Sequence, residues 1–206
     1  MANINAPYGF RTVSYLDGQS PNYAPTQRRI LKTNTTPIFR GDVVAQQATG
    51  YIALATPGTT QIAGIFDGCE YLSISQGRTV RSQFWPGNDA LLDVAAFVID
   101  SPNAVFQVQS GNGGPVVLAD IGQNINFNAG TGGNTFTGIS GQFADFATIG
   151  SAITLPFRII NFAGNSGYVT GDGPPAIVGN GSDGTTPFNT IYVTFNNQDY
   201  KSLTGI

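Results

Sequence analysis

The chain has 206 residues and few charges: 9 are basic, 12 are acidic and none is histidine, which gives a formal net charge of −3. Charged residues make up 10% of it, whereas ordinary soluble domains have about 25%. A net acidic chain without clustered Lys and Arg argues against a nucleic-acid partner. The lack of histidine removes the Ser-His and Cys-His nucleophile arrangements and most zinc sites.

The composition favours strands over helices. Glu70 is the only glutamate, and Lys32 and Lys201 are the only lysines, so the chain has little of the material that covers exposed helix faces. Its 27 glycines, 14 phenylalanines and 8 tyrosines suit strands and tight turns. The single Cys69 allows no internal disulfide and is expected to be a buried, inert thiol. We predict an all-β chain with a β-sandwich or jelly-roll-like domain.

Residues 1–40 differ from the rest, because they combine several prolines with basic residues and only one acid, Asp17. Proline interrupts both helices and sheet ladders, so we predict an extended Pro-rich arm with edge strands over 11–16 and 28–32. An irregular N-terminus packed on its own domain fits the same pattern. The first residues lack the basic and apolar regions of a secretory signal, and no apolar run approaches the roughly 20 residues that span a bilayer. We therefore expect no membrane partner.

Residues 41–206 are predicted to form one β-sandwich-like domain. Short apolar segments alternate with turn signals at a spacing of about ten residues, which is typical of sandwiches and barrels. The segment 104–109 has the period-two alternation of a half-buried strand. The strands predicted in the first part of this domain cover 43–45, 51–55, 62–66, 79–85, 95–99 and 104–109.

The second part of the domain contains two long Gly-rich loops, at about 126–141 and 164–186. A short helix is predicted around 119–123. Strands are predicted over 153–162, where Pro156 requires an edge or a bulge, and over 189–196, which alternates cleanly and ends the domain.

Few residues offer chemistry. Asp89 and Asp93 lie four residues apart and could form a catalytic carboxylate pair, but Asp89 lies in a Pro-Gly-Asn-Asp turn, where aspartate usually bonds backbone N–H groups. The segments 171–173 and 179–184 offer oxygen ligands for calcium without the spacing of a known calcium loop. We predict no catalytic residue, no cofactor and no metal.

Charge is distributed unevenly along the chain. Residues 1–40 are net positive, whereas no basic residue lies between Arg81 and Arg158, a stretch that holds five aspartates. This polarity favours contacts between copies, or an arm that docks on the acidic face of another protein. The residues predicted to make such contacts are Tyr8, Phe10, Arg11, Tyr15, Tyr23, Arg28, Arg29 and Arg40.

The N-terminal segment 1–11, which reads Met-Ala-Asn-Ile-Asn-Ala-Pro-Tyr-Gly-Phe-Arg, and Leu-Asp-Gly at 16–18 resemble the opening of a family of tailed-bacteriophage head structural proteins. Segments 64–71, 100–109 and 192–197 look like the same family. The resemblance implies a capsid decoration, or cement, protein that binds the outside of a phage head as a dimer or trimer. It also implies a β-sandwich, jelly-roll-like or β-tulip fold, and it brings no catalytic residues.

The sequence therefore predicts a non-enzymatic virion protein that is made in the bacterial cytoplasm and bridges major capsid protein subunits on the outer capsid surface. A homotrimer is the first expectation and a dimer the second. Three alternatives stay open. One is a receptor- or glycan-binding β module of a phage tail, with an exposed Trp85; another is a carboxylate hydrolase; the third is another minor head or tail structural protein.

Overall fold

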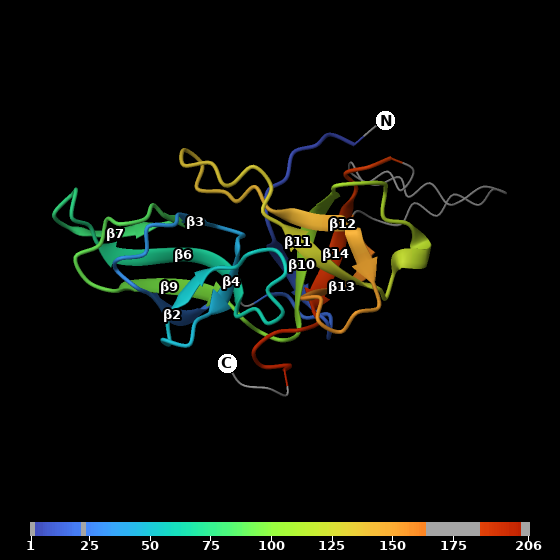
Figure 1. The fold of residues 1–206 in the computed structure, drawn as a ribbon, viewed down its shortest axis with the longest axis horizontal. Helices are drawn as coiled ribbons and strands as arrows, with labels where there is room; N and C mark the ends of the chain where they lie inside the picture. The colour runs from blue at the N-terminus through green and yellow to red at the C-terminus, as the bar shows by residue number, and fades with distance from the viewer. Residues whose placement is uncertain (1–2, 22–23, 164–185, 203–206) are drawn as a thin grey trace.

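The computed structural model describes residues 3–21, 24–163 and 186–202. Within these ranges the chain is all-β, with fourteen strands and one 3-10 turn, η1 (Leu118–Asp120), which confirms the predicted fold class. In the described part, no helix has the length and apolar character needed to cross a bilayer. The strands form two lobes that lie side by side along the long axis of the molecule (Figure 1).

The first lobe, here called the barrel lobe, is a sheet that closes on itself. β10 pairs with β14, β14 with β13, β13 with β11 and β11 with β12, all antiparallel, and β12 returns to β10 in a short parallel contact. β1 lies antiparallel along the first half of β10 as an edge strand. The strands of this lobe are β1 (Arg11–Tyr15), β10 (Ala104–Gly111), β11 (Asn124–Asn128), β12 (Phe143–Gly150), β13 (Phe157–Phe162) and β14 (Thr190–Phe195).

The second lobe, here called the sheet lobe, is an open sheet in the order β2-β9-β6-β4-β5, with β7 paired to the far part of β6. A two-stranded ribbon of β3 and β8 accompanies it. Its strands are β2 (Thr26–Ile30), β3 (Ile38–Phe39), β4 (Val43–Gln46), β5 (Ile52–Leu54), β6 (Gly64–Leu72), β7 (Thr79–Ser82), β8 (Phe84–Trp85) and β9 (Val94–Ile99).

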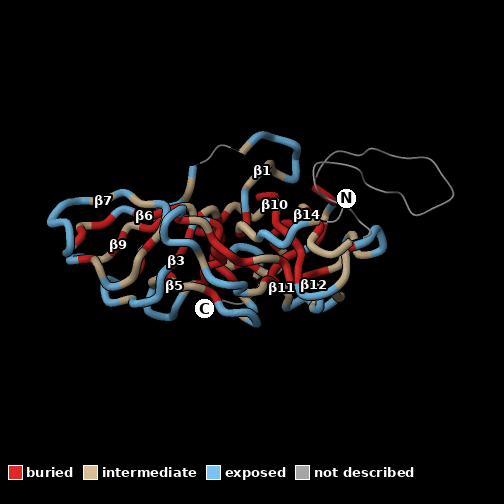
Figure 2. The backbone as a smooth tube through the Cα atoms, turned by 90° about the horizontal axis from the view of Figure 1, so that it is seen from above, coloured by how far each residue is buried: buried red, intermediate tan, exposed pale blue. Residues whose placement is uncertain are grey.

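Each lobe has its own hydrophobic cluster, and two strands contribute to both. In β4, Val43 belongs to the barrel cluster and Val44 to the sheet cluster; in β6, Ile65 and Phe66 divide in the same way. Because successive side chains of a strand point to opposite faces, these strands have both faces buried. Buried residues accordingly continue from one lobe into the other (Figure 2).

The predicted edge strands of the N-terminal region correspond to β1 and β2, which lie at the edges of the two sheets. Tyr15 of β1 packs against the barrel cluster and Ile30 of β2 belongs to the sheet cluster, so both strands pack on their own chain. The division into an arm of residues 1–40 and a domain of residues 41–206 stays a prediction.

Other predictions need correction or fall outside the described residues. The helix expected around 119–123 is only the short turn η1. β11 overlaps the start of the loop expected at about 126–141, and β12 forms where the sequence predicted no element. The strand expected over 153–162 begins only at Phe157, because 153–156 turn and Pro156 has no N–H for a ladder. The predicted loop at 164–186 falls, apart from its last residue, outside the described residues.

Candidate functional site

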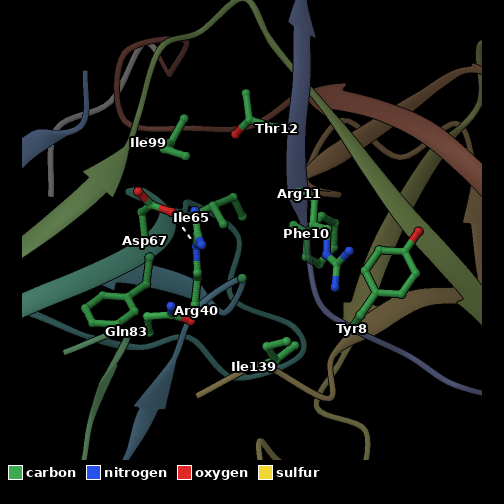
Figure 3. A pocket seen from close by; sticks show the side chains of 12 residues that line it. Tyr8, Phe10, Arg11, Thr12, Arg40, Ile65, Asp67, Gln83, Ile99 and Ile139 are labelled. Carbon is green, nitrogen blue, oxygen red and sulfur yellow. Dashed lines mark hydrogen bonds and ion pairs between the residues drawn. The ribbon is translucent and has the colours of Figure 1, made fainter. Parts of the chain in front are cut away.

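The two lobes meet at a cavity of about 270 Å³. Its apolar wall comes from Phe10, Ile65, Ile99 and Ile139, and its polar wall from Arg11, Arg40 and Asp67. In the close view, Arg40 and Asp67 lie on one side, and Arg11 with Tyr8 on the other (Figure 3).

Two further depressions share lining residues with this cavity. One shares Arg40 and Asp67 with the cavity and adds Arg81 and Phe97. The other shares Tyr8 and Arg11 with it and adds residues of the loop that joins β11 to β12. We call the three together the basic groove.

Backbone geometry brings the walls of the groove together. Gly9 (φ 73°) and Gly41 (φ 94°) both have positive φ, and a Cβ on Gly9 would stand 2.6 Å from Ser140 Cβ and 2.7 Å from the Gly41 oxygen. The Phe10 N–H donates to the Gly41 carbonyl at 2.9 Å. Only glycine allows this crossing of two backbones, and the crossing holds Arg11 near Arg40.

A β-bulge sets the position of Asp67. Phe66 pairs with Val98 and Gly68 pairs with Phe97, so Asp67 is the extra residue of β6 opposite β9. Bulges redirect a side chain out of the regular ladder, and here Asp67 Oδ1 accepts from Arg40 Nε at 2.8 Å. Among the described residues Asp67 is the one acceptor found for the Arg40 side chain, so the Nη groups of this half-exposed side chain can bind another acceptor.

The other two guanidiniums lie on aromatic rings. Arg11 Cζ is 4.4 Å from the centroid of the Tyr8 ring, and Arg81 Cζ is 5.1 Å from that of Phe97. Stacking of this kind fixes the plane of a guanidinium while leaving its N–H groups free to donate. Glu70 faces Arg81 across the β6–β7 ladder, but it does not line the groove.

The groove therefore has side chains that suit a carboxylate ligand. Three guanidiniums and one carboxylate line it, on a chain with a net charge of −3. Arginine binds carboxylates with paired, planar N–H donors, and the apolar wall suits the side chains that flank an acidic residue. An extended acidic segment of a protein fits this combination.

The structure groups only some of the predicted contact residues. Tyr8, Arg11 and Arg40 line the groove, and Phe10 contributes to its floor. The expectation that Phe10 is an exposed anchor is corrected, because its side chain is 3% exposed and its ring stacks on Phe157 at 4.5 Å. Tyr15 is half-buried against the barrel cluster, and Tyr23 lies outside the described residues.

The two arginines of β2 lie elsewhere. Arg28 forms an ion pair with Asp100 at 2.9 Å and donates to the Tyr200 hydroxyl at 2.6 Å, which joins β2 to the C-terminal segment. Arg28 therefore connects two parts of its own chain, and its contact with a partner stays a prediction. Arg29 is exposed on the same strand and does not line the groove.

Trp85 and Cys69 are both core residues. Trp85 is completely buried and packs edge-to-face on Tyr71, so it cannot stack on a sugar as the glycan-binding alternative requires. Cys69 is also fully buried, and its burial raises the pKa of the thiol to about 12. The expectation that this thiol is buried is confirmed.

The candidate carboxylate pair has other partners. Asp89 accepts from Ser73 Oγ at 2.7 Å and from the Ser75 N–H at 2.9 Å, and these hydrogen bonds lower its pKa. Asp93 accepts from the Tyr51 hydroxyl at 2.8 Å. Asp89 thus has the turn-stabilising role that the sequence indicated.

Among the described residues, no three His, Cys, Asp or Glu side chains lie close enough together to hold a metal ion. The candidate calcium segments 171–173 and 179–184 lie outside these ranges.

Sequence reasoning missed Arg81 and Phe97. They lie far from Arg11 and Arg40 in the chain, and only the pairing of β6 with both β7 and β9 brings them to the groove. No local motif marks them. The alternation of polar and apolar residues in 79–81 was the one available signal.

Comparison with known proteins gave no relatives: no protein-family model matches the chain, and no curated protein or solved structure matches it.

Proposed function

We propose that this chain is a non-enzymatic structural protein of a virus particle, a decoration protein that binds the outer surface of a tailed-phage head. It bridges major capsid protein subunits there, as a trimer or, as the second arrangement, a dimer. The basic groove carries the proposal, because it concentrates guanidiniums of a charge-poor chain on one face. The N-terminal resemblance described above supplies the class of partner.

The proposed mechanism is thermodynamic linkage. Each copy binds the assembled shell and not its separated subunits, so binding shifts the equilibrium towards the intact head. Many copies on one particle add their contributions through multivalency. Low surface charge suits this role, since the centres of protein interfaces are depleted in charged residues.

Replacing Arg11, Arg40 and Arg81 together by glutamine is expected to weaken binding to heads by roughly 100-fold, because three charge-assisted contacts are lost. The assay is co-sedimentation of purified protein with heads assembled in cells that lack this chain. Binding of the unchanged protein should also weaken with added salt, which screens exposed charges.

A triple variant of Arg29, Lys32 and Arg78 to glutamine is the matched control, because it removes the same charge from exposed positions outside the groove. It should bind within about twofold of the unchanged protein. If both triple variants bound heads equally weakly, the loss would come from total charge and not from the groove. Failure of the unchanged protein to bind heads at all would reject the proposed function.

A further inference from the structure

The loop between β11 and β12 presents a phenylalanine to solvent. Phe136 is 97% exposed, the highest value among the exposed large hydrophobic residues of the described chain. It lies in the turn 135–138, which the bridge between Asn134 and Ile139 closes. The loop between β11 and β12 reaches from the barrel lobe towards β3 (Figure 1). Its neighbours Thr135 and Thr137 are polar and also exposed.

The turn that carries Phe136 is closed by hydrogen bonds. Asn134 Oδ1 accepts from the N–H of Phe136 at 2.8 Å and from that of Thr137 at 3.2 Å. The Gly138 N–H donates to the Asn134 carbonyl at 2.7 Å, and the Asn134 N–H donates to Ile139 at 2.9 Å. The exposed ring therefore stands on an ordered turn, so a partner that binds it need not order the backbone.

The loop is also fixed to the wall of the basic groove. The Arg40 N–H donates to Gly138 and the Ser140 N–H donates to Arg40, both at 3.0 Å. At its base the backbone passes so close that a Cβ on Gly130 would overlap the Gly141 oxygen. Asn134 and Thr137, on either side of the ring, line the groove itself.

We infer that Phe136 is an aromatic anchor that enters an apolar pocket on the protein whose acidic segment occupies the basic groove. The inference rests on the proposed function and names the partner's surface: an apolar pocket next to carboxylates. Anchors of interfaces are typically aromatic and held in place beforehand. A lipid surface fits less well, because a single ring between threonines lacks the extended apolar face of membrane-binding segments.

The test compares Phe136→Ala with Ile153→Ala, which removes an apolar side chain that is 82% exposed in a different loop. Binding is measured by co-sedimentation with heads assembled without this chain, and thermal unfolding checks that both variants fold. Phe136→Ala is expected to weaken binding roughly 10- to 100-fold. Ile153→Ala is expected to change it less than about twofold, and neither should shift the unfolding temperature, because surface substitutions have small effects.

The outcomes separate the inference from the proposed function. If the unchanged protein binds heads and Phe136→Ala binds equally well, or both variants weaken alike, the anchor is wrong while the decoration role stands. If the unchanged protein does not bind heads, the decoration role itself fails. The inference would also be wrong if Phe136→Ala lost binding to anionic lipid vesicles but kept its binding to heads. It would be wrong too if the Phe136 ring were needed for self-association of this chain.

Discussion

Replacing Phe106 by alanine is expected to lower the free energy of unfolding by about 3–5 kcal/mol. Phe106 is fully buried in β10 and packs edge-on against Phe195 at 4.9 Å and against Phe10 at 6.5 Å. The substitution removes apolar area and leaves a cavity that close-packed neighbours cannot fill. Urea unfolding gives the free energy, and the melting temperature should fall by roughly 6–20 °C.

The same substitution at an exposed position is the control for this prediction. Phe136→Ala removes an identical side chain that is 97% exposed, so the free energy of unfolding should stay within about 0.5 kcal/mol of its original value. A loss below about 1 kcal/mol in Phe106→Ala would show that the four-ring cluster of Phe10, Phe106, Phe157 and Phe195 is not the centre of the barrel core.

Asp42 is expected to make stability depend on pH in the unusual direction for a carboxylate. Its side chain is 3% exposed, and burial raises its pKa from 3.8 to about 6, although hydrogen bonds from Ser140 and the Phe39 N–H oppose the shift. The folded state therefore keeps the proton to higher pH than the unfolded state. The contribution of Asp42 to stability is greatest below about pH 4 and declines by about 3 kcal/mol as pH rises through 6.

Asp42→Asn should remove this decline, because an amide does not ionise. Urea unfolding at pH 4, 5, 6 and 7 is expected to show the variant gaining stability relative to the original protein as pH rises. Asp17→Asn, at an exposed turn, serves as the control and should follow the original profile. Parallel profiles for Asp42→Asn and the original protein would mean that Asp42 is ionised in the folded state without a burial cost.

The fold class could be predicted because the composition and the clear strand patterns agree. Segments such as 104–109 and 189–196 alternate apolar and polar residues, and they correspond to the strands β10 and β14, which pair with each other. β12 was missed because its sequence, Phe-Ala-Asp-Phe-Ala-Thr-Ile-Gly, has no strict alternation and follows a glycine-dense run. Its strand state depends on pairing with β10 and β11.

The candidate site was predicted only in part, because several of its features depend on contacts between distant residues. Charge content alone put Arg11 and Arg40 in the contact set, and the structure brings both to the groove. Sequence could not show that Arg28 has an internal partner in Asp100, because 72 residues separate them. Nor could it distinguish Phe10 in the core from Phe136 at the surface, since hydrophobicity is identical and only the fold decides exposure.

The shared strands β4 and β6 have a consequence for how the molecule melts. Val43 and Val44 are consecutive residues, but Val43 packs in the barrel cluster and Val44 in the sheet cluster. Unfolding of one lobe would therefore disrupt the strands that support the other. We therefore expect a calorimeter to record one peak, with equal calorimetric and van't Hoff enthalpies. On a particle that this chain covers, as proposed above, neither lobe would unfold at a lower temperature than the other.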